Sequence, residues 1–490
     1  MGLFFKGSKR PKSGMIHHDA VPMIRARFDA ATTNDVNRRH WLMADNLSAD
    51  AAASPEVRRI LRSRARYEVA NNSYARGIVL TLANDAIGTG PRLQMLTDDA
   101  EANAFIEEAF AQWCKAIGLP EKLRTMRMAR AESGEVFCIL ASNPRLDVQV
   151  KLDLRLIEAD QVATPNIKLL NDRVVDGIIF DGFGNPVEYH ILKSHPGDIR
   201  LGGQLSFSNE FDRLPSRSVI HYFRADRPQQ SRGIPDITPA LPLFAQLRRY
   251  TLAVLGAAET AADFSGILYT DAPASGESEA VEPMDAIELE ARALLTMPGG
   301  WRMEQVRAEQ PSTTYGEFKR EILNEIARCL NMPFNVAAGN SSGYNFASGK
   351  LDHQVYFKSI RVEQEHLGRV VLDRLLVAFL REAVLISGFL PLHVRTLVAS
   401  DQLPMHQWFW DGQSEVDPAK EANAQATRLT NHTTTLAYEY ARQGRDWEAE
   451  LRQRAKELKL MNELGLQTED VRIEPNSIGD DNNDGENTEI

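Results

Sequence analysis

Residues 350 to about 387 have the periodicity of one long helix, and this segment constrains the fold more than any other. Its apolar side chains recur at helical spacing at positions 351, 355, 360, 367, 371, 375 and 379. At 1.5 Å per residue such a helix spans roughly 55 Å. Charged residues interrupt it, so we expect it to contact water and not a bilayer: Arg361, Glu363, Arg369, Asp373 and Arg381.

Further helices are marked by their ends. The segment 34–141 is mostly helical in pattern, and 236–264 has its prolines confined to the start, where a missing N–H costs least. Thr314 and Glu317 have the spacing of a capping box, and Pro333 closes that helix. A last helical region is expected from about 417 to 464.

Between residues 148 and 223 the period changes from helical to alternating. Apolar residues alternate with polar ones over 148–156, which predicts a half-buried strand. The segment VVDGIIFDGFGNPVEYHIL predicts a hairpin with a turn at DGFGNP, and SVIHYF at 218–223 is expected to complete a small sheet. The fold class is therefore α+β.

The glycines in NDAIGTGPRLQ raise the possibility of a phosphate-binding loop. Such a loop follows a strand and opens a helix, so that free helix N–H groups point at the anion. Here a helical pattern precedes the glycines, and Pro91 prevents its continuation. We therefore interpret Gly88 as a left-handed residue at the end of a helix.

The segment GNSSGYNFASGK contains two partial catalytic motifs. GNSSG fits G-x-S-x-G, which would make Ser341 a hydrolase nucleophile, but neither the flanking pattern nor any later acid or histidine supports this. Candidate partners downstream are Asp352, Asp401, His406 and His432. A Walker motif is excluded, because Gly343 and Gly349 enclose five residues and Leu351 replaces the hydroxyl residue after Lys350.

Metal and cofactor chemistry find no clear support in the sequence. His190 and His195 are five residues apart, without a recognised metal-ligand spacing, so we expect structural roles. The three cysteines Cys114, Cys138 and Cys329 form no CxxC pair, which favours reduced thiols in the core. We expect no catalytic residue, no metal and no cofactor.

Charge is distributed unevenly along the chain. Residues 1–40 carry eight Lys or Arg against three Asp, whereas 469–490 carry eight acidic residues against one Arg. The formal net charge is −11, so the central body is acidic too, which weighs against a protein built to grip nucleic acid. We expect a basic flexible arm at 1–24 and an acidic disordered tail at 469–490.

Several segments, taken in order from about residue 25 to 465, resemble the lambda-type portal proteins of tailed bacteriophages. None is specific alone, and two depart from the usual pattern, at Gly300 and at Phe346, Gly349 and Lys350. The segments are NNSYARGIVLTLANDAIGTGPRLQ, GEVF at 134–137, IEAD at 157–160, DRPQQSRGIP, LTMPGGWRMEQV, YNFASGK and VDPAKEANA at 416–424.

The resemblance implies a closed ring of identical subunits, usually twelve, at one capsid vertex, through which double-stranded DNA passes without sequence specificity. It implies docking of the terminase large subunit, the major capsid or scaffold protein and head-completion proteins. It places the protein in the virion, and in the host cytoplasm during assembly, with no membrane. The implied portal fold has long stem helices, small β-rich wing and clip elements and a helical C-terminal crown. The expected regions are the wing at 25–235, stem helices at 236–264 and 312–333, the clip at 265–311, a channel-loop candidate, long helix and return to the wing at 334–414, and the crown at 415–468.

In such a ring the connection before the long helix is expected to project into the channel. Its glycines permit backbone motion and its uncharged polar side chains offer weak contacts to a sliding phosphate backbone. Lys350 is its one cation, equally consistent with a solvated lysine at a helix start. The candidate loop residues are Gly339, Asn340, Ser341, Ser342, Gly343, Asn345 and Lys350. Two alternatives remain: a serine hydrolase using Ser341, and a monomeric helical binding scaffold.

Overall fold

The computed structural model describes residues 35, 37–164, 174–198, 210–263, 267–270, 301–304, 314–343, 345–398, 403–412 and 418–466. The described chain begins with a run of helices: α1 (Ala49–Ala52), α2 (Pro55–Asn71), α3 (Ser73–Ile87), α4 (Ala100–Ile117) and α5 (Leu119–Ser133). Four of these helices have side-chain N-caps that accept a backbone N–H: Ser48, Ser54, Asn72 and Asp99. Local sequence therefore sets where these helices begin.

Helix α3 ends as expected, at a glycine with positive φ. Gly88 has φ 57°, and the carboxylate of Asp411 accepts hydrogen bonds from Thr89 N and, at 2.7 Å, from Thr89 Oγ1. A Cβ on Gly88 would lie 2.9 Å from Asp411 Cγ. Gly88 therefore ends α3 and leaves room for the side chain of Asp411, which confirms the helix-end interpretation.

Two small antiparallel sheets follow. The first has the order β3 (Leu152–Ile157), β2 (Glu135–Ser142), β8 (Val219–Phe223). The second has the order β4 (Val174–Val175), β5 (Ile178–Phe180), β6 (Pro186–Leu192), β7 (Phe211–Pro215). The predicted hairpin is confirmed as β5 and β6.

Two sequence expectations need correction here. The helical territory ends at Ser133, because GEVF opens strand β2. The strand predicted over 148–156 spans Leu152–Ile157. SVIHYF completes a small sheet as expected, by pairing with β2, and the hairpin belongs to the other sheet. A further pairing joins β1 (Arg92–Met95) to β11 (His406–Phe409), more than 300 residues apart along the chain.

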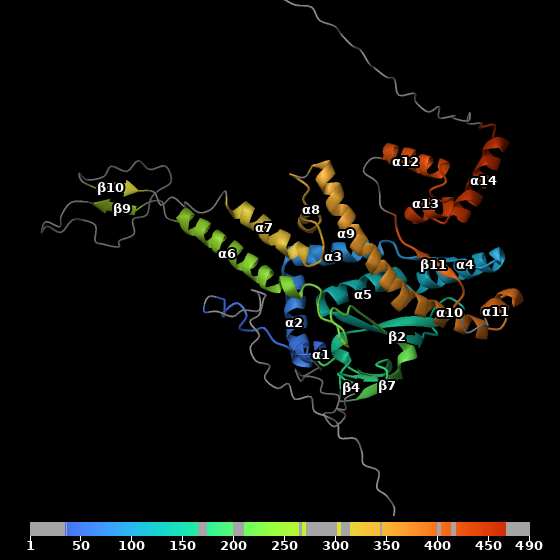
Figure 1. Ribbon diagram of the computed structural model, residues 1–490, viewed down its shortest axis with the longest axis horizontal. Helices are drawn as coiled ribbons and strands as arrows, with labels where there is room; N and C mark the ends of the chain where they lie inside the picture. Colours follow the sequence, from blue (N-terminus) through green and yellow to red (C-terminus); the bar gives the residue numbers. More distant parts are fainter. Residues whose placement is uncertain are drawn as a thin grey trace, which may run out of the picture.

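Two helices extend away from the body. After the short 3₁₀ turn Thr238–Ala240, α6 (Leu241–Asp263) runs outward and α7 (Thr314–Arg328) returns beside it, with the hairpin β9 (Ile267–Thr270) and β10 (Trp301–Glu304) beyond their ends (Figure 1). Most of the expected clip at 265–311 lies outside the described residues.

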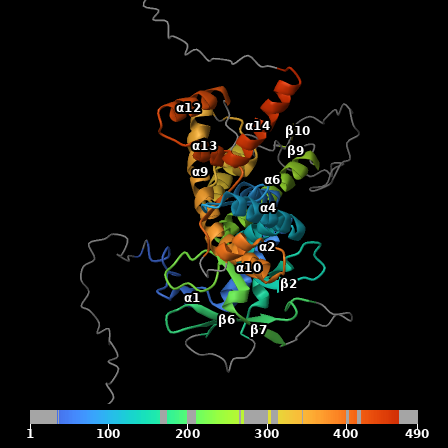
Figure 2. The same cartoon turned by 90° about the vertical axis from the view of Figure 1, so that its right-hand side faces the viewer.

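The long helix is confirmed. It begins as α9 (Phe346–Leu367), continues through a π-helical turn at Gly368–Leu372 and ends as α10 (Asp373–Leu385). Short helices α8 (Phe334–Ala338) and α11 (Leu392–Val398) flank it. The last helical region divides into α12 (Pro418–Thr430), α13 (Leu436–Arg442) and α14 (Trp447–Glu463), which lie at the end of the body opposite β7 (Figures 1 and 2).

Buried apolar residues form three clusters. The largest joins α4, α5, β2 and α10, the second joins α2, α3, α7 and the base of α6, and the third lies between the two sheets. Each contains residues that are far apart in sequence, so the clusters hold the helices and sheets together. Among the described helices, none combines the length and the apolar character that crossing a bilayer requires.

Candidate functional site

Two of the segments with family resemblance meet around one buried carboxylate. Glu135, from GEVF, has no solvent exposure. Arg232, from DRPQQSRGIP, contacts it through Nη2, 2.7 Å from Oε1. Arg62 on α2 also pairs with Oε1, while His221 Nε2 lies 2.9 Å from Oε2. We call these four residues the Glu135 cluster.

Electrostatics keep this carboxylate charged. Burial alone would raise the pKa of Glu135, but Arg232, His221 and Arg62 together hold that pKa well below its usual range. Arg232 is itself completely buried and also donates to the carbonyl oxygens of Val162 and Ala159, each at 3.2 Å. Removing one member of such a buried ion-pair set leaves its partner charged and unpaired in the core, which strongly destabilises the folded protein.

Two glycines allow the motif segments to approach so closely. A Cβ on Gly233 would lie 2.6 Å from the carbonyl carbon of Gly134, and a Cβ on Gly134 would lie 2.7 Å from that of Gly233. Gly134 also has φ 88°, which side-chain-bearing residues rarely adopt. The Gly233 N–H then donates to Glu135 Oε2 at 2.9 Å. Glycine in both segments is thus a steric requirement of the Glu135 cluster.

A second buried ionic cluster connects the long helix to the base of the projecting helices. Arg127 Nη1 on α5 lies 3.0 Å from Asp236 Oδ2, just before α6, and Arg130 pairs with Glu363 on α9. Tyr222 also donates to Glu363. We call these residues the Glu363 cluster. Burial would raise the pKa of Glu363, but the two arginines and the donated hydrogen bonds lower it to about 2.

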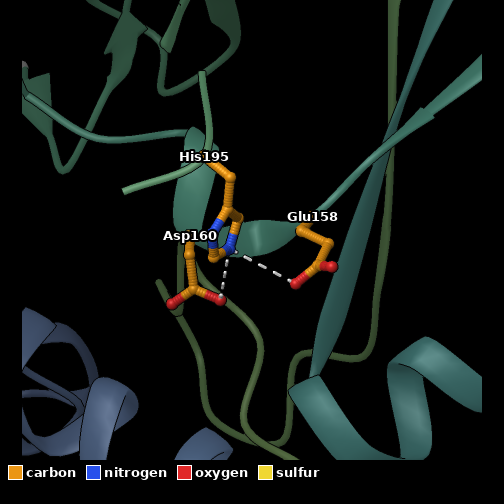
Figure 3. A group of neighbouring side chains, drawn as sticks. All are labelled: Glu158, Asp160 and His195. Carbon is orange, nitrogen blue, oxygen red and sulfur yellow. Dashed lines mark ion pairs between the residues drawn. The ribbon is translucent and has the colours of Figure 1, made fainter. Parts of the chain in front are cut away.

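The structure brings together one group that the sequence did not indicate. His195 Nε2 lies 3.4 Å from Glu158 Oε2 and 4.0 Å from Asp160 Oδ2 (Figure 3). Metal-ligating atoms could in principle share this space, since all three lie within 4.8 Å of one another. However, Arg66 Nη2 already lies 3.1 Å from Glu158 and 2.7 Å from Asp160. A guanidinium therefore supplies the cation, and we interpret the group as an ion-pair network.

The candidate loop forms an exposed turn between α8 and α9. Gly339 and Gly343 have φ 63° and 89°, and Asn340, Ser341, Ser342 and Asn345 are exposed. Asn340 Oδ1 accepts the N–H of Ser342 at 2.8 Å, and Asn345 Oδ1 accepts that of Ser348 at 2.8 Å. Asn345 is thus the N-cap of α9, and its side-chain Oδ1 is already occupied by the hydrogen bond that caps the helix. Lys350 is exposed in the first turns of α9.

This geometry does not support a nucleophile elbow. Ser341 follows a helix instead of a strand, and among the described residues it makes no hydrogen bond. His406 is held by Asp373 Oδ1 at 3.1 Å and by the carbonyl oxygen of Pro404, while His432 is exposed between α12 and α13. Asp352 is exposed on α9, and Asp401 lies outside the described residues.

The cysteines are free thiols, as expected. Cys138 is buried, and Cys114 and Cys329 are half-buried. Burial raises the pKa of each thiol, that of Cys329 to about 11, which disfavours the reactive thiolate.

Comparisons with known proteins agree with the motif segments. The family model described as "Phage portal protein, lambda family" matches residues 36–364. A probable portal protein of Halomonas phage phiHAP-1 is 27% identical over 433 residues, which cover 83% of this chain and 81% of the relative.

Solved structures with a similar chain come from gene transfer agent (GTA) particles. One, from the neck of an empty particle computed with C6 symmetry, is 15% identical with a TM-score of 0.41, covering 74% of this chain and 87% of that one. Another, from the neck of a native particle computed with C12 symmetry, is 13% identical with a TM-score of 0.41, covering 78% and 90%.

The family model includes both motif glycines, every residue of the Glu135 and Glu363 clusters and the exposed turn before α9. The chain belongs to the lambda family of phage portal proteins.

Proposed function

We propose that this portal protein assembles into a closed ring of twelve identical subunits at one vertex of a phage capsid. Double-stranded DNA passes through the ring during packaging and ejection, without sequence-specific contacts. The family match over residues 36–364 carries this proposal. The protein is then a component of the virion, and its assembly takes place in the host cytoplasm.

The projecting helices suit the stem of such a ring. Helices α6 and α7 lie side by side and extend from the body, with the β9–β10 hairpin beyond them (Figure 1). We assign α6 and α7 to the stem, 265–311 to the clip, the sheets with α2 to α5 to the wing, and α12 to α14 to the crown. The Glu363 cluster then joins the stem base to the helix that follows the candidate loop.

The turn at 339–345 and Lys350 are assigned to the channel surface. Exposed side chains there keep hydrogen-bond donors available, namely the Ser341 and Ser342 hydroxyls and the Asn side-chain amides, whereas phosphate oxygens only accept. Such contacts are weak and sequence-independent, as a sliding duplex requires. Because the chain carries a net negative charge, we expect little salt-dependent adhesion of DNA to the protein.

The ring implies external partners. The terminase large subunit would supply the motor activity as a separate polypeptide, the major capsid or scaffold protein would surround the wing, and head-completion proteins would bind after packaging. In this arrangement the chain acts as a conduit and a docking site, with no cofactor of its own.

Mass measurement under native conditions tests the assembly. Subunits in a cyclic ring associate head to tail, so a single closed species should form, with a mass of ~660 kDa for twelve copies of the 54.8 kDa chain. Only monomers and twofold dimers across a wide concentration range would refute the proposal. A monomer with esterase activity lost in Ser341→Ala would instead support the hydrolase alternative.

A further inference from the structure

The described chain begins with an exposed apolar segment. Trp41, Leu42 and Met43 are 55%, 71% and 88% exposed, and His40 separates them from Arg38 and Arg39. Neither arginine makes an ion pair within the described part of the chain. Three consecutive large apolar side chains in water are unfavourable, and tryptophan and arginine are enriched in the energetic centres of protein interfaces. We call residues 38–43 the anchor segment.

The anchor segment is held against the body at its C-terminal side. Arg227 Nη2 donates to the carbonyl oxygen of Leu47 at 2.9 Å, and Ser231 N donates to Asp50 Oδ1 at 2.8 Å. Both donors belong to the DRPQQSRGIP segment that carries Arg232 of the Glu135 cluster. The exposed apolar side chains therefore lie only a few residues before Leu47 and Asp50, which are hydrogen-bonded to the body.

Helix α7 has an unfilled hollow of about 490 Å³ on its surface, lined by Phe318, Glu321, Ile322, Asn324, Glu325 and Arg328. Phe318 is 44% exposed, so the hollow has an apolar wall in contact with water. Glu321 and Glu325 form no ion pair with any other described residue. The α7 hollow thus combines an apolar wall with two carboxylates and one guanidinium, that of Arg328, and its net charge is negative.

Charge selects the α7 hollow over other exposed apolar surfaces as the place for the anchor segment. The stripe Leu351, Val355 and Val362 on α9 is flanked by two cations, Lys358 and Arg361, and two anions, Asp352 and Glu365, so it offers Arg38 and Arg39 no net attraction. Glu321 and Glu325 would attract the same arginines.

The two surfaces of one copy do not meet each other. Figure 1 shows the start of the described chain, in dark blue, on the opposite side of α6 from α7. An interface between two different surfaces of the same chain is heterologous, and repetition of such a contact closes a ring when the rotation permits.

We propose that the anchor segment of one copy packs into the α7 hollow of the next copy, with Arg38 and Arg39 paired to Glu321 and Glu325. This inference rests on the proposed ring. A buried Trp side chain covers about 150–250 Å², a small part of a stable interface of about 1,600 Å². The anchor segment therefore sets which surfaces of neighbouring copies meet, and other contacts complete the interface.

Charge exchange tests the pairing. Arg38→Glu with Arg39→Glu, and separately Glu321→Lys with Glu325→Lys, should each lower the yield of rings at least ~10-fold at moderate salt, because like charges then face each other. Combining all four substitutions in one chain should restore most of the yield. Unchanged yield in both double variants, or no recovery in the combined variant, would overturn the inference.

Cross-linking tests whether the contact forms between copies. A Met43→Cys chain mixed with an Asn324→Cys chain before assembly should give disulfide-linked dimers on mild oxidation. A Met43→Cys chain mixed with the unaltered chain controls for Cys329, and Leu351→Cys in place of Asn324→Cys is the position-matched control. Rings without the specific dimer would refute this contact alone, whereas failure of the unaltered chain to form rings would refute the assembly itself.

Discussion

Arg232 and Glu135 form an ion pair between two fully buried side chains. Arg232 Nε lies 2.9 and 3.0 Å from the two carboxylate oxygens, and both side chains are 0% exposed. The pair joins a loop that precedes α6 to the first residue of β2. It therefore links the base of the projecting helices to the central sheet.

Removing Arg232 should destabilise the protein strongly. In Arg232→Ala the buried Glu135 loses its principal partner, and breaking such a pair from one side costs about 3–5 kcal/mol. Thermal unfolding of purified protein should show a large decrease in midpoint, or soluble yield should collapse. Arg59→Ala is the matched control, since Arg59 and Glu56 pair with side chains 70% and 65% exposed, and it should leave the midpoint unchanged.

Adding one methyl group at Gly233 should be as damaging as removing a charge. A Cβ there would lie 2.6 Å from the carbonyl carbon of Gly134 and 2.8 Å from Glu135 Cβ, so Gly233→Ala must displace β2 or the loop before α6. We expect poor folding, seen as loss of soluble protein. Gly77→Ala on α3 meets nothing within 4 Å, and helix propensity predicts stabilisation by up to about 1 kcal/mol. A Gly233→Ala protein as stable as Gly77→Ala would contradict the close approach.

Acid should loosen the contact between α5 and α9. The pKa of Glu363 is about 2 in the folded protein, below its ordinary value of 4.5, so its charge stabilises the fold above the ordinary value. That contribution disappears as pH falls from about 4.5 toward 2. Glu363→Gln should be less stable near neutral pH and lose less stability over this acid range, as followed by circular dichroism. Glu365→Gln, exposed on the same helix, should follow the unaltered protein.

Positive charge on the exposed turn should slow DNA movement if the turn faces the channel. Ser341→Lys with Ser342→Lys adds counterion-dependent grip on every subunit, so translocation into assembled particles should slow most at low salt. Asn345 must be kept, because its side chain caps α9 and its loss would confuse the result. Ser341→Ala with Ser342→Ala should package normally. If rings of the lysine variant are intact and translocate DNA as fast as the unaltered protein at both low and high salt, the turn does not belong to the channel surface.

The sequence by itself determined the features that depend on neighbouring residues. The end of α3 at Gly88 and the turn between β5 and β6 follow from backbone preferences and hydrogen bonds that act within a few positions. The long helix from 346 to 385 was likewise recognisable, since its apolar side chains recur at helical spacing. Ordered motif segments also indicated the family.

Only the tertiary structure decided which charged residues meet. Glu135 collects partners from positions 62, 221 and 232, and β1 pairs with β11 across more than 300 residues. His195 joins Glu158 and Asp160 although its sequence spacing carries no such signal. Ion pairs and strand pairs of this kind are selected by packing, because many arginines and carboxylates are locally equivalent until the core brings particular ones within a few ångströms.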